Sequence, residues 1–290
     1  MEKLKESQLI INPDGSIYHL SLRPGQLADT VLLVGDPGRV EKISDRFDKI
    51  EYKVNNREMF THTGYKNGRR LSVISTGIGP DNIDIVLNEL DALVNIDFGK
   101  RMPKEKHSRL NLIRIGTSGT IQPDIPINSF GLATHGLGLD GMFYYYDAID
   151  KVQEQNITDR FIESTGWPAK LPRPYVVKGS SELQKLLGEG MYQGITATAP
   201  GFYAPQGRSL RLPPKYSGLN EKIAGFSYND LRVINFEMET SALYGLGKAL
   251  GHNAITVCAI IANRAKELYS KNPARPIEEL IDTVLERITV

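Results

Sequence analysis

The sequence predicts an α/β fold in which a single-domain, mixed but mostly parallel sheet is flanked by helices. Short apolar runs typical of buried strands alternate with segments of helical periodicity. Glycine turns directly follow several of these runs, as they do where a parallel strand leads into a helix. The chain of 290 residues contains no linker-like stretch, so one domain over residues 1–290 is expected.

Two strand–turn–helix units open the chain. Residues 31–34 form an apolar run, which is followed by a turn at residues 35–39 and by a polar helical pattern. Residues 71–74 form the next apolar run, and a glycine turn at residues 75–80 follows it. The helix predicted after this second turn carries one apolar stripe, formed by Ile83, Val86, Leu90 and Leu93.

The rest of the chain continues this alternation. Residues 112–115 predict a third buried strand, which is expected to end in a turn at residues 116–119. Residues 98–109 are charged and contain Pro103, so they are expected to form an exposed insertion. Strands are also predicted at residues 129–134, 194–199 and 255–261, and helices at residues 240–250 and from Pro276 onward.

The composition argues against several classes of protein. The 35 basic and 34 acidic side chains give a formal charge of +1, which does not favour a nucleic-acid surface. Cys258 is the only cysteine, so no disulfide framework, cysteine-based metal cluster or other metal site is predicted. No apolar run reaches the ~18 residues that span a membrane, and residues 1–8 lack the apolar core of a signal peptide. A cytoplasmic protein is expected.

The most informative motif is the carboxylate pair Glu237 and Glu239, which Met238 separates. It follows the apolar residues Val233 and Ile234 and opens the helix predicted at residues 240–250. A carboxylate at a helix N-terminus is stabilised there and only accepts hydrogen bonds, which suits a ligand that carries hydroxyl groups. The alternative is that acidic residues simply favour the first turn of a helix.

Glycines and arginines near two strand ends point to an anion. The turn at residues 35–39 is too short for a nucleoside triphosphate loop, but Gly35 lets backbone N–H groups approach an anion. Arg39 can then add charged hydrogen bonds. Arg114 lies in an apolar strand shortly before Thr117, which is costly unless the arginine meets an anion. Alternatively, the turn is a plain connection and Arg114 pairs with a structural carboxylate.

A loop after the strand at residues 194–199 matches the hydrogen-bonding edge of uracil. The amide of Gln206 both donates and accepts, and Arg208 two positions later only donates. Together they fit the N3–H and the two carbonyl groups of that base, and Phe202 can pack on its ring. Taken alone, this segment is equally described as a polar surface loop.

In combination, these segments resemble the nucleoside phosphorylase family, specifically its uridine phosphorylase branch. The resemblance implies an α/β enzyme that uses phosphate to split a nucleoside into a base and ribose 1-phosphate. Uridine and phosphate are the implied substrates, and no organic cofactor is needed. The resemblance runs from about His19 to Arg264 and rests on four motifs in the family's order: Gly35-Asp36-Pro37-x-Arg39, Arg114-Ile115-Gly116-Thr117, Gln206-x-Arg208 and Glu237-Met238-Glu239.

The resemblance also implies a homo-oligomer whose active sites are shared between subunits. Arg57 resembles an arginine that a neighbouring subunit inserts into the phosphate site, and His19 resembles a histidine that reaches a neighbour's ribose 5′-hydroxyl. The implied phosphate site is Gly35, Arg39, Arg57, Arg114 and Thr117; the implied nucleoside site is His19, Thr117, Phe202, Gln206, Arg208, Glu237, Met238 and Glu239; the implied catalytic residues are Arg39, Arg114, Gln206, Arg208 and Glu239.

One position favours a pyrimidine base. Purine-specific relatives carry an aspartate that assists the leaving base after the strand predicted at residues 255–261, and this chain has Asn263 there. Three rival functions stay open at the level of the sequence: a purine nucleoside phosphorylase, a hydrolytic nucleosidase and a non-catalytic nucleoside-binding protein. The arginines at positions 39, 57 and 114 speak against the nucleosidase, which has no need of a phosphate site.

Overall fold

A twelve-stranded sheet runs through the computed structural model, which describes residues 3–290. In its middle, neighbouring strands pair parallel except β13 and β8, and β12 also pairs antiparallel with β7. These strands are largely buried on both faces, as expected where helices cover a sheet. The middle strands, in spatial order, are β12 (Leu231–Glu237), β10 (Tyr192–Thr198), β8 (Phe130–Gly138), β13 (Asn253–Asn263), β7 (Asn111–Thr120) and β1 (Thr30–Val34).

Further strands extend this central part of the sheet. On one side β4 (Arg69–Ser75) pairs parallel with β1, and β3 (Met59–Lys66) and β2 (Lys49–Asn56) follow it as an antiparallel meander. The other additions are short: β9 (Tyr175–Lys178) pairs with β8, β11 (Ser227–Tyr228) with β12, and β14 (Leu268–Tyr269) with β13. The fold class predicted from the sequence, a mixed sheet flanked by helices, is confirmed.

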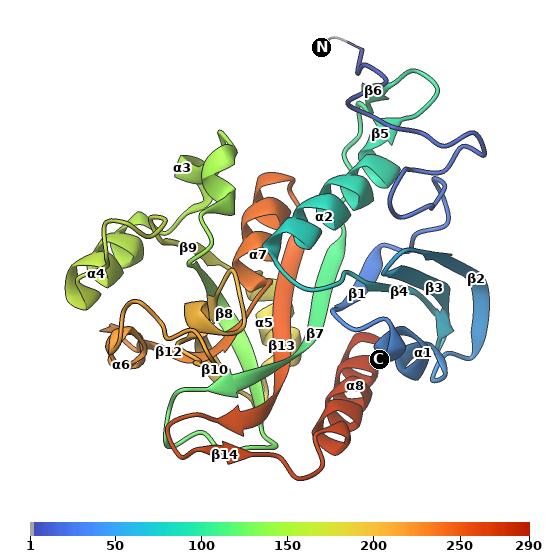
Figure 1. Ribbon diagram of the computed structural model, residues 1–290. Coiled ribbons are helices and arrows are strands. Elements are labelled where there is room, and N and C mark those ends of the chain that lie inside the picture. The colour runs from blue at the N-terminus through green and yellow to red at the C-terminus, as the bar shows by residue number, and fades with distance from the viewer. Residues whose placement is uncertain (1–2) are drawn as a thin grey trace.

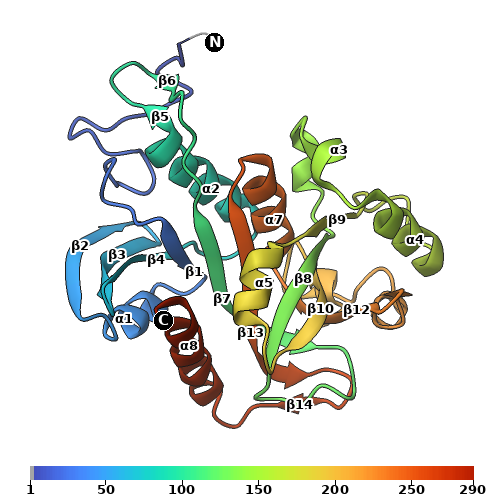
Figure 2. The same cartoon turned by 180° about the vertical axis from the view of Figure 1, so that it is seen from behind.

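Helices cover both faces of this sheet (Figures 1 and 2). On one face α2 (Pro80–Asn95) and α7 (Thr240–Ala249) contact each other, and α7 packs on β8 and β13. On the other face α5 (Ser181–Leu187) and α8 (Ala274–Ile288) contact each other and β13. The remaining helices lie nearer the periphery: α1 (Gly38–Ser44), α3 (Ile149–Val152), α4 (Gln155–Thr165) and α6 (Leu219–Ala224), with 3-10 turns η1 (Met142–Tyr145) and η2 (Ala204–Gln206).

The predicted turn at residues 116–119 is wrong, because β7 continues through it to Thr120. Gly116 leaves space for the side chain of Arg114 and does not form a turn. A Cβ at this position would lie 2.2 Å from Nη1 of Arg114 and 3.0 Å from Sγ of Cys258. Glycine in a strand often marks such a close approach, and here it leaves room for the guanidinium beside the backbone.

The structure also shows the insertion at residues 98–109 and the place of Glu237 in the fold. Residues 98–109 are largely exposed, as predicted, and they include β6 (Met102–Pro103), which pairs with β5 (Ile96–Asp97) as a separate two-stranded ribbon. The prediction that Glu237 opens a helix is wrong, because Glu237 is the last residue of β12. Glu239 caps the N-terminus of α7 instead. The pair therefore joins a strand to a helix.

Candidate active site

A cavity of about 690 Å³ lies at the carboxyl ends of β1, β10 and β12. The last residues of β7 and β13 also line it. Ligands of α/β proteins collect at the carboxyl ends of strands, so this is the expected place for a site. The cavity brings together ten residues that the sequence predicted: Gly35, Arg39, Arg114, Thr117, Phe202, Gln206, Arg208, Glu237, Met238 and Glu239.

Two arginines, Arg39 and Arg114, lie near each other in the lining of the cavity. Arg39 follows β1 and donates from Nη1 to the backbone oxygen of Ile115 at 3.1 Å. Burial lowers the pKa of Arg39, and the positive charge of Arg114 lowers it further. The buried Nε of Arg114 has no hydrogen-bond partner within the described residues 3–290. Two like charges in a partly dry cavity are the arrangement that an anion such as phosphate would stabilise.

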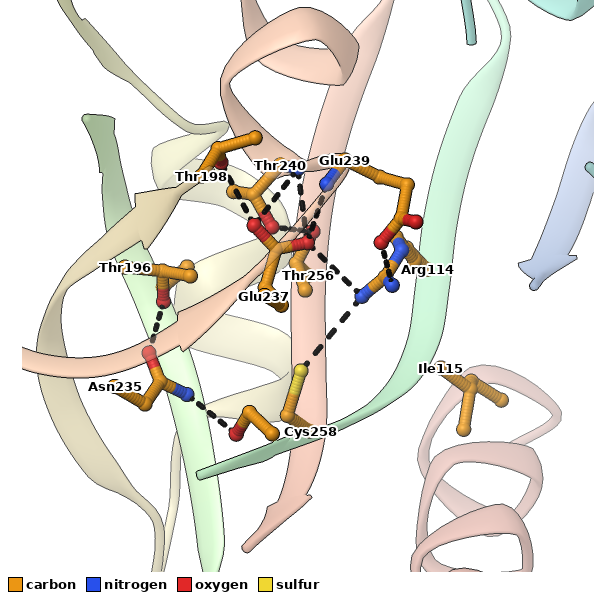
Figure 3. A network of polar contacts seen from close by, with 12 residues as sticks. Arg114, Ile115, Thr196, Thr198, Asn235, Glu237, Glu239, Thr240, Thr256 and Cys258 are labelled. Carbon is orange, nitrogen blue, oxygen red and sulfur yellow. Dashed lines mark hydrogen bonds and ion pairs between the residues drawn. The ribbon is translucent and has the colours of Figure 1, made fainter. Parts of the chain in front are cut away.

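Arg114 is also held by both carboxylates of the motif (Figure 3). Its Nη2 donates to Glu239, and its Nη1 lies 3.3 Å from Oε2 of Glu237. Burial alone would lower the pKa of Arg114, but the charges of Glu239 and Glu237 raise it above its ordinary value. The sequence left open whether Arg114 meets an anion or a structural carboxylate, and the structure shows that it pairs with carboxylates.

Glu237 is saturated by hydrogen bonds. Its oxygens accept from Oγ1 of Thr198 at 2.7 Å, from the N–H of Glu239 at 2.9 Å and from the N–H of Thr240 at 3.0 and 3.1 Å. It therefore caps the start of α7 and fixes the backbone that carries Glu239 (Figure 3). Thr198 was not singled out in the sequence, and no local pattern marks it, because the contact joins two strands.

Glu239 is the carboxylate that remains available to a ligand. Oε1 accepts from the N–H of Gly79 at 2.8 Å, and the other oxygen is paired with Arg114. The side chain is buried, with a residue exposure of 3%. Burial raises the pKa of Glu239, Arg114 opposes this, and the neighbouring charge of Glu237 adds to it. Each carboxylate oxygen can accept more than one hydrogen bond, so Glu239 keeps capacity for hydroxyl donors.

A second group of polar side chains in the cavity lining carries amide and guanidinium groups. Gln206 is buried, and its Oε1 accepts from Nη1 of Arg208 at 2.5 Å. The guanidinium of Arg208 lies 3.9 Å above the ring of Phe202, which stays half exposed. Burial and the charge of Arg264 lower the pKa of Arg208 to about 10, so it remains charged at neutral pH. These side chains can recognise a polar planar group and stabilise negative charge on it.

Arg264 is a cavity residue that sequence reasoning missed as a site residue. Its guanidinium lies 5.7 Å from the centre of the Phe236 ring, and its Nη1 is buried without a hydrogen-bond partner in the described part of the chain. The signal that could have identified it is the same as for Arg114, a charged residue at the carboxyl end of a buried strand.

Asn263 also lines the cavity, but its amide is used by the fold. Nδ2 donates to the backbone oxygens of Gln122 at 3.0 Å and Ile125 at 2.8 Å, and Oδ1 accepts from the N–H of Lys266 at 3.0 Å. Both donors and the acceptor are therefore engaged. Asn263 holds the end of β13 in place and has no free N–H for a base.

Two predicted residues, His19 and Arg57, do not line the cavity of their own chain. They lie next to each other: Nδ2 of Asn56 donates to the backbone oxygen of His19 at 2.8 Å, and the Arg57 guanidinium lies 5.6 Å from the centre of the Tyr18 ring. Nδ1 of His19 is 2.6 Å from Glu89. Their assignment to a neighbouring subunit's site stays a prediction.

Two histidines and an aspartate lie close together elsewhere in the chain. Ligand atoms of Asp91, His107 and His252 lie within 4.8 Å of one another. However, Nδ1 of His252 accepts from the N–H of Leu110 at 3.2 Å, so Nε2 carries the proton of the neutral ring. Oδ1 of Asp91 is 3.2 Å from this nitrogen, but Nε2 makes no hydrogen bond within the described residues 3–290. Because the lone pair of Nδ1 is already used by Leu110, the neutral ring of His252 offers no free lone pair to a metal ion.

Comparison with known proteins decides the family. The family model described as "Phosphorylase superfamily" matches residues 29–288. The chain belongs to the phosphorylase superfamily. In the described residues of this superfamily member, no helix is both long enough and apolar enough to cross a membrane.

Relatives of known activity cover most of this phosphorylase. It is 33% identical over 279 residues to a uridine phosphorylase of Thermococcus kodakarensis, which covers 93% of this chain and 86% of the relative. It is 30% identical to a uridine phosphorylase of Haemophilus influenzae, with 87% and 88% covered. The solved structure of Trypanosoma brucei nucleoside phosphorylase, described as showing uridine phosphorylase activity, superposes with a TM-score of 0.86. It is 29% identical and covers 96% of this chain and 98% of its own.

Proposed function

We propose that this enzyme is a uridine phosphorylase, a pentosyltransferase that converts uridine and phosphate into uracil and ribose 1-phosphate in pyrimidine salvage. The observation that carries the proposal is the set of groups that one cavity brings together. Arg39, Arg114 and the buried carboxylate of Glu239 form one group, and the amide of Gln206 with the guanidinium of Arg208 forms another. A phosphate, a ribose and a uracil have hydrogen-bonding groups that match this set. One sheet runs through the chain, which supports treating residues 1–290 as one domain.

Phosphate is the co-substrate and nucleophile in this proposal, and no organic cofactor takes part. Arg39 and the unpartnered Nε of Arg114 would hold it, with the hydroxyl of Thr117 and backbone N–H groups near Gly35 as further donors. A phosphate oxygen attacks C1′ of the ribose while the bond from C1′ to the base nitrogen breaks. The sugar gains positive charge during this step, and the phosphate's own negative charge stabilises it.

Glu239 would orient the ribose through its 2′- and 3′-hydroxyls, which donate to the carboxylate. Its contribution is positional, because it holds C1′ in line between the phosphate and the base. Glu237, whose oxygens are already occupied, would keep Glu239 and Arg114 in place rather than bind the sugar. Met238, which lines the cavity beside them, would pack against the sugar ring.

Gln206 and Arg208 would recognise uracil and stabilise the negative charge that spreads onto its carbonyl groups as the bond breaks. Nη1 of Arg208 donates to Oε1 of Gln206, which holds the guanidinium beside the amide that would face the base. Arg264 adds a second positive charge near Arg208. Phe202 would pack on the base from the mouth of the cavity.

A homo-oligomer with shared sites is part of the proposal. Glu89 lies against Nδ1 of His19, which favours the tautomer with a free lone pair on Nε2. That nitrogen can accept a hydrogen bond from the 5′-hydroxyl of a ribose in a neighbouring subunit. Arg57 next to it would complete the neighbour's phosphate site. A cytoplasmic location also stays a prediction.

A purine nucleoside phosphorylase is the second candidate, and a non-catalytic nucleoside-binding protein is the third. The engaged amide of Asn263 favours the pyrimidine enzyme, because it offers a purine neither an acid nor a free donor. Release of free base from uridine, inosine and thymidine should be measured with and without phosphate. Phosphate-dependent cleavage of uridine is expected, with inosine a poor substrate. Binding of uridine without any cleavage would support the third candidate instead.

A further inference from the structure

The loop that carries Gln206 and Arg208 is held together mainly by its own hydrogen bonds. The N–H groups of Gln206 and Arg208 both donate to the backbone oxygen of Tyr203, at 3.0 and 2.8 Å. The Arg208 side chain donates to the backbone oxygen of Phe202 at 2.8 Å. These bonds shape the turn, but they do not fix its position relative to the sheet.

Asn220 supplies the connection to the rest of the fold. Its Nδ2 donates to the backbone oxygen of Gln206 at 2.9 Å. Among the hydrogen bonds of residues 3–290, this one alone ties residues 202–208 to another element of the structure. The next residue, Gly207, has φ +68°, and a Cβ there would lie 2.0 Å from Nδ2 of Asn220. The amide thus lies directly against the turn that presents the Gln206 side chain.

The position of Asn220 is itself well defined. It lies in the first turn of α6, and Ile223 of the same helix is buried in a hydrophobic cluster with Phe226 and Val233. Because α6 packs beside β12 (Figure 1), the hydrogen bond from Asn220 fixes the loop relative to the sheet.

The loop separates two cavities. Phe202, Gln206 and Arg208 line the candidate active site, whereas other residues of the loop line a second cavity of about 650 Å³. Asn220 lines this second cavity, so its hydrogen bond to Gln206 lies at the edge of a region where the loop is not fully packed. Lining residues of the second cavity that belong to the loop are Ala204, Pro205 and Gly207.

We infer that Asn220 is a positioning residue for base recognition, which acts through the backbone of Gln206 without touching the substrate. This inference rests on the proposed function. Asn220 aligns the side-chain amide of Gln206 with the leaving base. Because Arg208 donates to that amide, Asn220 also helps to position Arg208. Charge stabilisation at a developing carbonyl anion depends on donors that are already in place, so a loosened loop lowers turnover more than binding.

The test compares Asn220→Asp with Lys222→Ala, an exposed change in the same helix. Aspartate has the same shape but cannot donate, and its charge opposes the carbonyl of Gln206. Losing one such hydrogen bond should lower kcat for uridine by about ten-fold. The KM for phosphate should stay within about two-fold, because Asn220 does not line the cavity that contains the proposed phosphate site. Gly207→Ala disturbs the same contact from the other side and should give the same pattern.

The leaving base separates positioning from a general loss of structure. 5-Fluorouracil is a better leaving group than uracil, so 5-fluorouridine needs less charge stabilisation and should lose less activity in Asn220→Asp. In the Arg208→Ala background, Asn220→Asp should add less than three-fold, because the two changes then remove one function. Unchanged kcat would overturn the inference, as would equal losses on both substrates together with a lower melting temperature. If wild type does not cleave uridine with phosphate, the proposed function itself is wrong.

Discussion

The guanidinium of Arg114, a proposed phosphate ligand, donates to the carboxylate of Glu239, the proposed ribose ligand. The same guanidinium lies 3.3 Å from Glu237, so one buried cation holds two carboxylates at the start of α7. Breaking a buried pair of this kind leaves an unpaired charge in a dry environment. Changes at Arg114 should therefore affect both the binding of phosphate and the order of the sugar site.

Arg114→Ala should raise the phosphate concentration needed for base release by ten-fold or more. A hydrogen bond to a charged group contributes about 1.5–3 kcal/mol, and about 1.4 kcal/mol corresponds to one decade. Initial rates against phosphate concentration measure this effect. Arg173→Ala, which removes an exposed arginine paired with Asp159, serves as the control and should leave the phosphate dependence unchanged. Equal cleavage of uridine in phosphate-free buffer would contradict the phosphorylase assignment.

Shared active sites predict recovery of activity in mixed oligomers. Arg57→Ala and Glu239→Ala should each be nearly inactive alone, because each removes one contributor from every site. When the two chains are unfolded and assembled together, one site of a two-fold pair can be wholly wild type. Activity should return in mixed oligomers that are verified by mass. A fully active monomer, or no recovery in such oligomers, would show that Arg57 does not act in trans.

Base selectivity should depend on Gln206 and Arg208. Arg208→Ala should lower kcat for uridine at least ten-fold, on the order of 1.4 kcal/mol, and weaken binding less, because its hydrogen bond strengthens as charge builds on the base. Gln206→Glu should be at least as harmful, since a carboxylate cannot donate and repels that charge. Steady-state kinetics with uridine and inosine test both changes. Wild-type cleavage of inosine as fast as uridine would refute the pyrimidine assignment.

Asn263→Asp should destabilise the fold instead of creating a purine enzyme. The aspartate would face the backbone oxygens of Gln122 and Ile125, which now accept from the amide. Leaving two buried acceptors without donors beside a charge should cost about 3 kcal/mol or more. Asn229→Asp, in an exposed turn, is the control. Thermal denaturation and the inosine-to-uridine rate ratio are the readouts, and a stable variant with faster inosine cleavage would disprove this prediction.

Stability should fall at acid pH because of His135. Burial lowers the pKa of His135 from 6.5 to about 4, with Lys178 and Lys248 adding to the decrease and Glu154 opposing it. The unfolded chain then binds the proton more readily, so stability is complete above pH ~6.5 and is lost as the pH falls toward 4. The loss is at most about 3 kcal/mol. Denaturant unfolding of His135→Gln should show a shallower acid decline, while the exposed His107→Gln should match wild type.

The sequence predicted most of the middle strands because their burial on two faces leaves a continuous apolar run, as in Val31 to Val34. It did not predict β12, β2 or β3. The burial of β2 is mixed, so its pattern gives no clear period, and its pairing partner is needed to define it. The turn expected at Gly116 was wrong for a different reason. Its glycine serves a contact with Arg114 and Cys258, which come from this strand and its neighbour.

The sequence predicted individual cavity residues where a motif was local, as for Gln206 with Arg208. The prediction was incomplete where a contact joins distant segments. Thr198 donates to Glu237 from the neighbouring strand, and Asn220 donates to Gln206 from a helix fourteen residues later in the chain. Such partners have no periodicity or spacing that a single sequence could reveal. The division of labour between Glu237 and Glu239 likewise depends on which oxygens are already occupied, which only the folded chain shows.

The unequal support of the proposed ribose and base sites has a consequence for redesign. Glu237 accepts four hydrogen bonds from three donor groups. Substitutions beside it would therefore disturb the start of α7, the end of β10 and the ion pair with Arg114 together. The loop at residues 202–208 has a single hydrogen bond to its surroundings among the described residues 3–290. A library of variants confined to this loop and to Asn220 should therefore change which nucleobase is accepted and leave the proposed binding of phosphate and ribose unchanged.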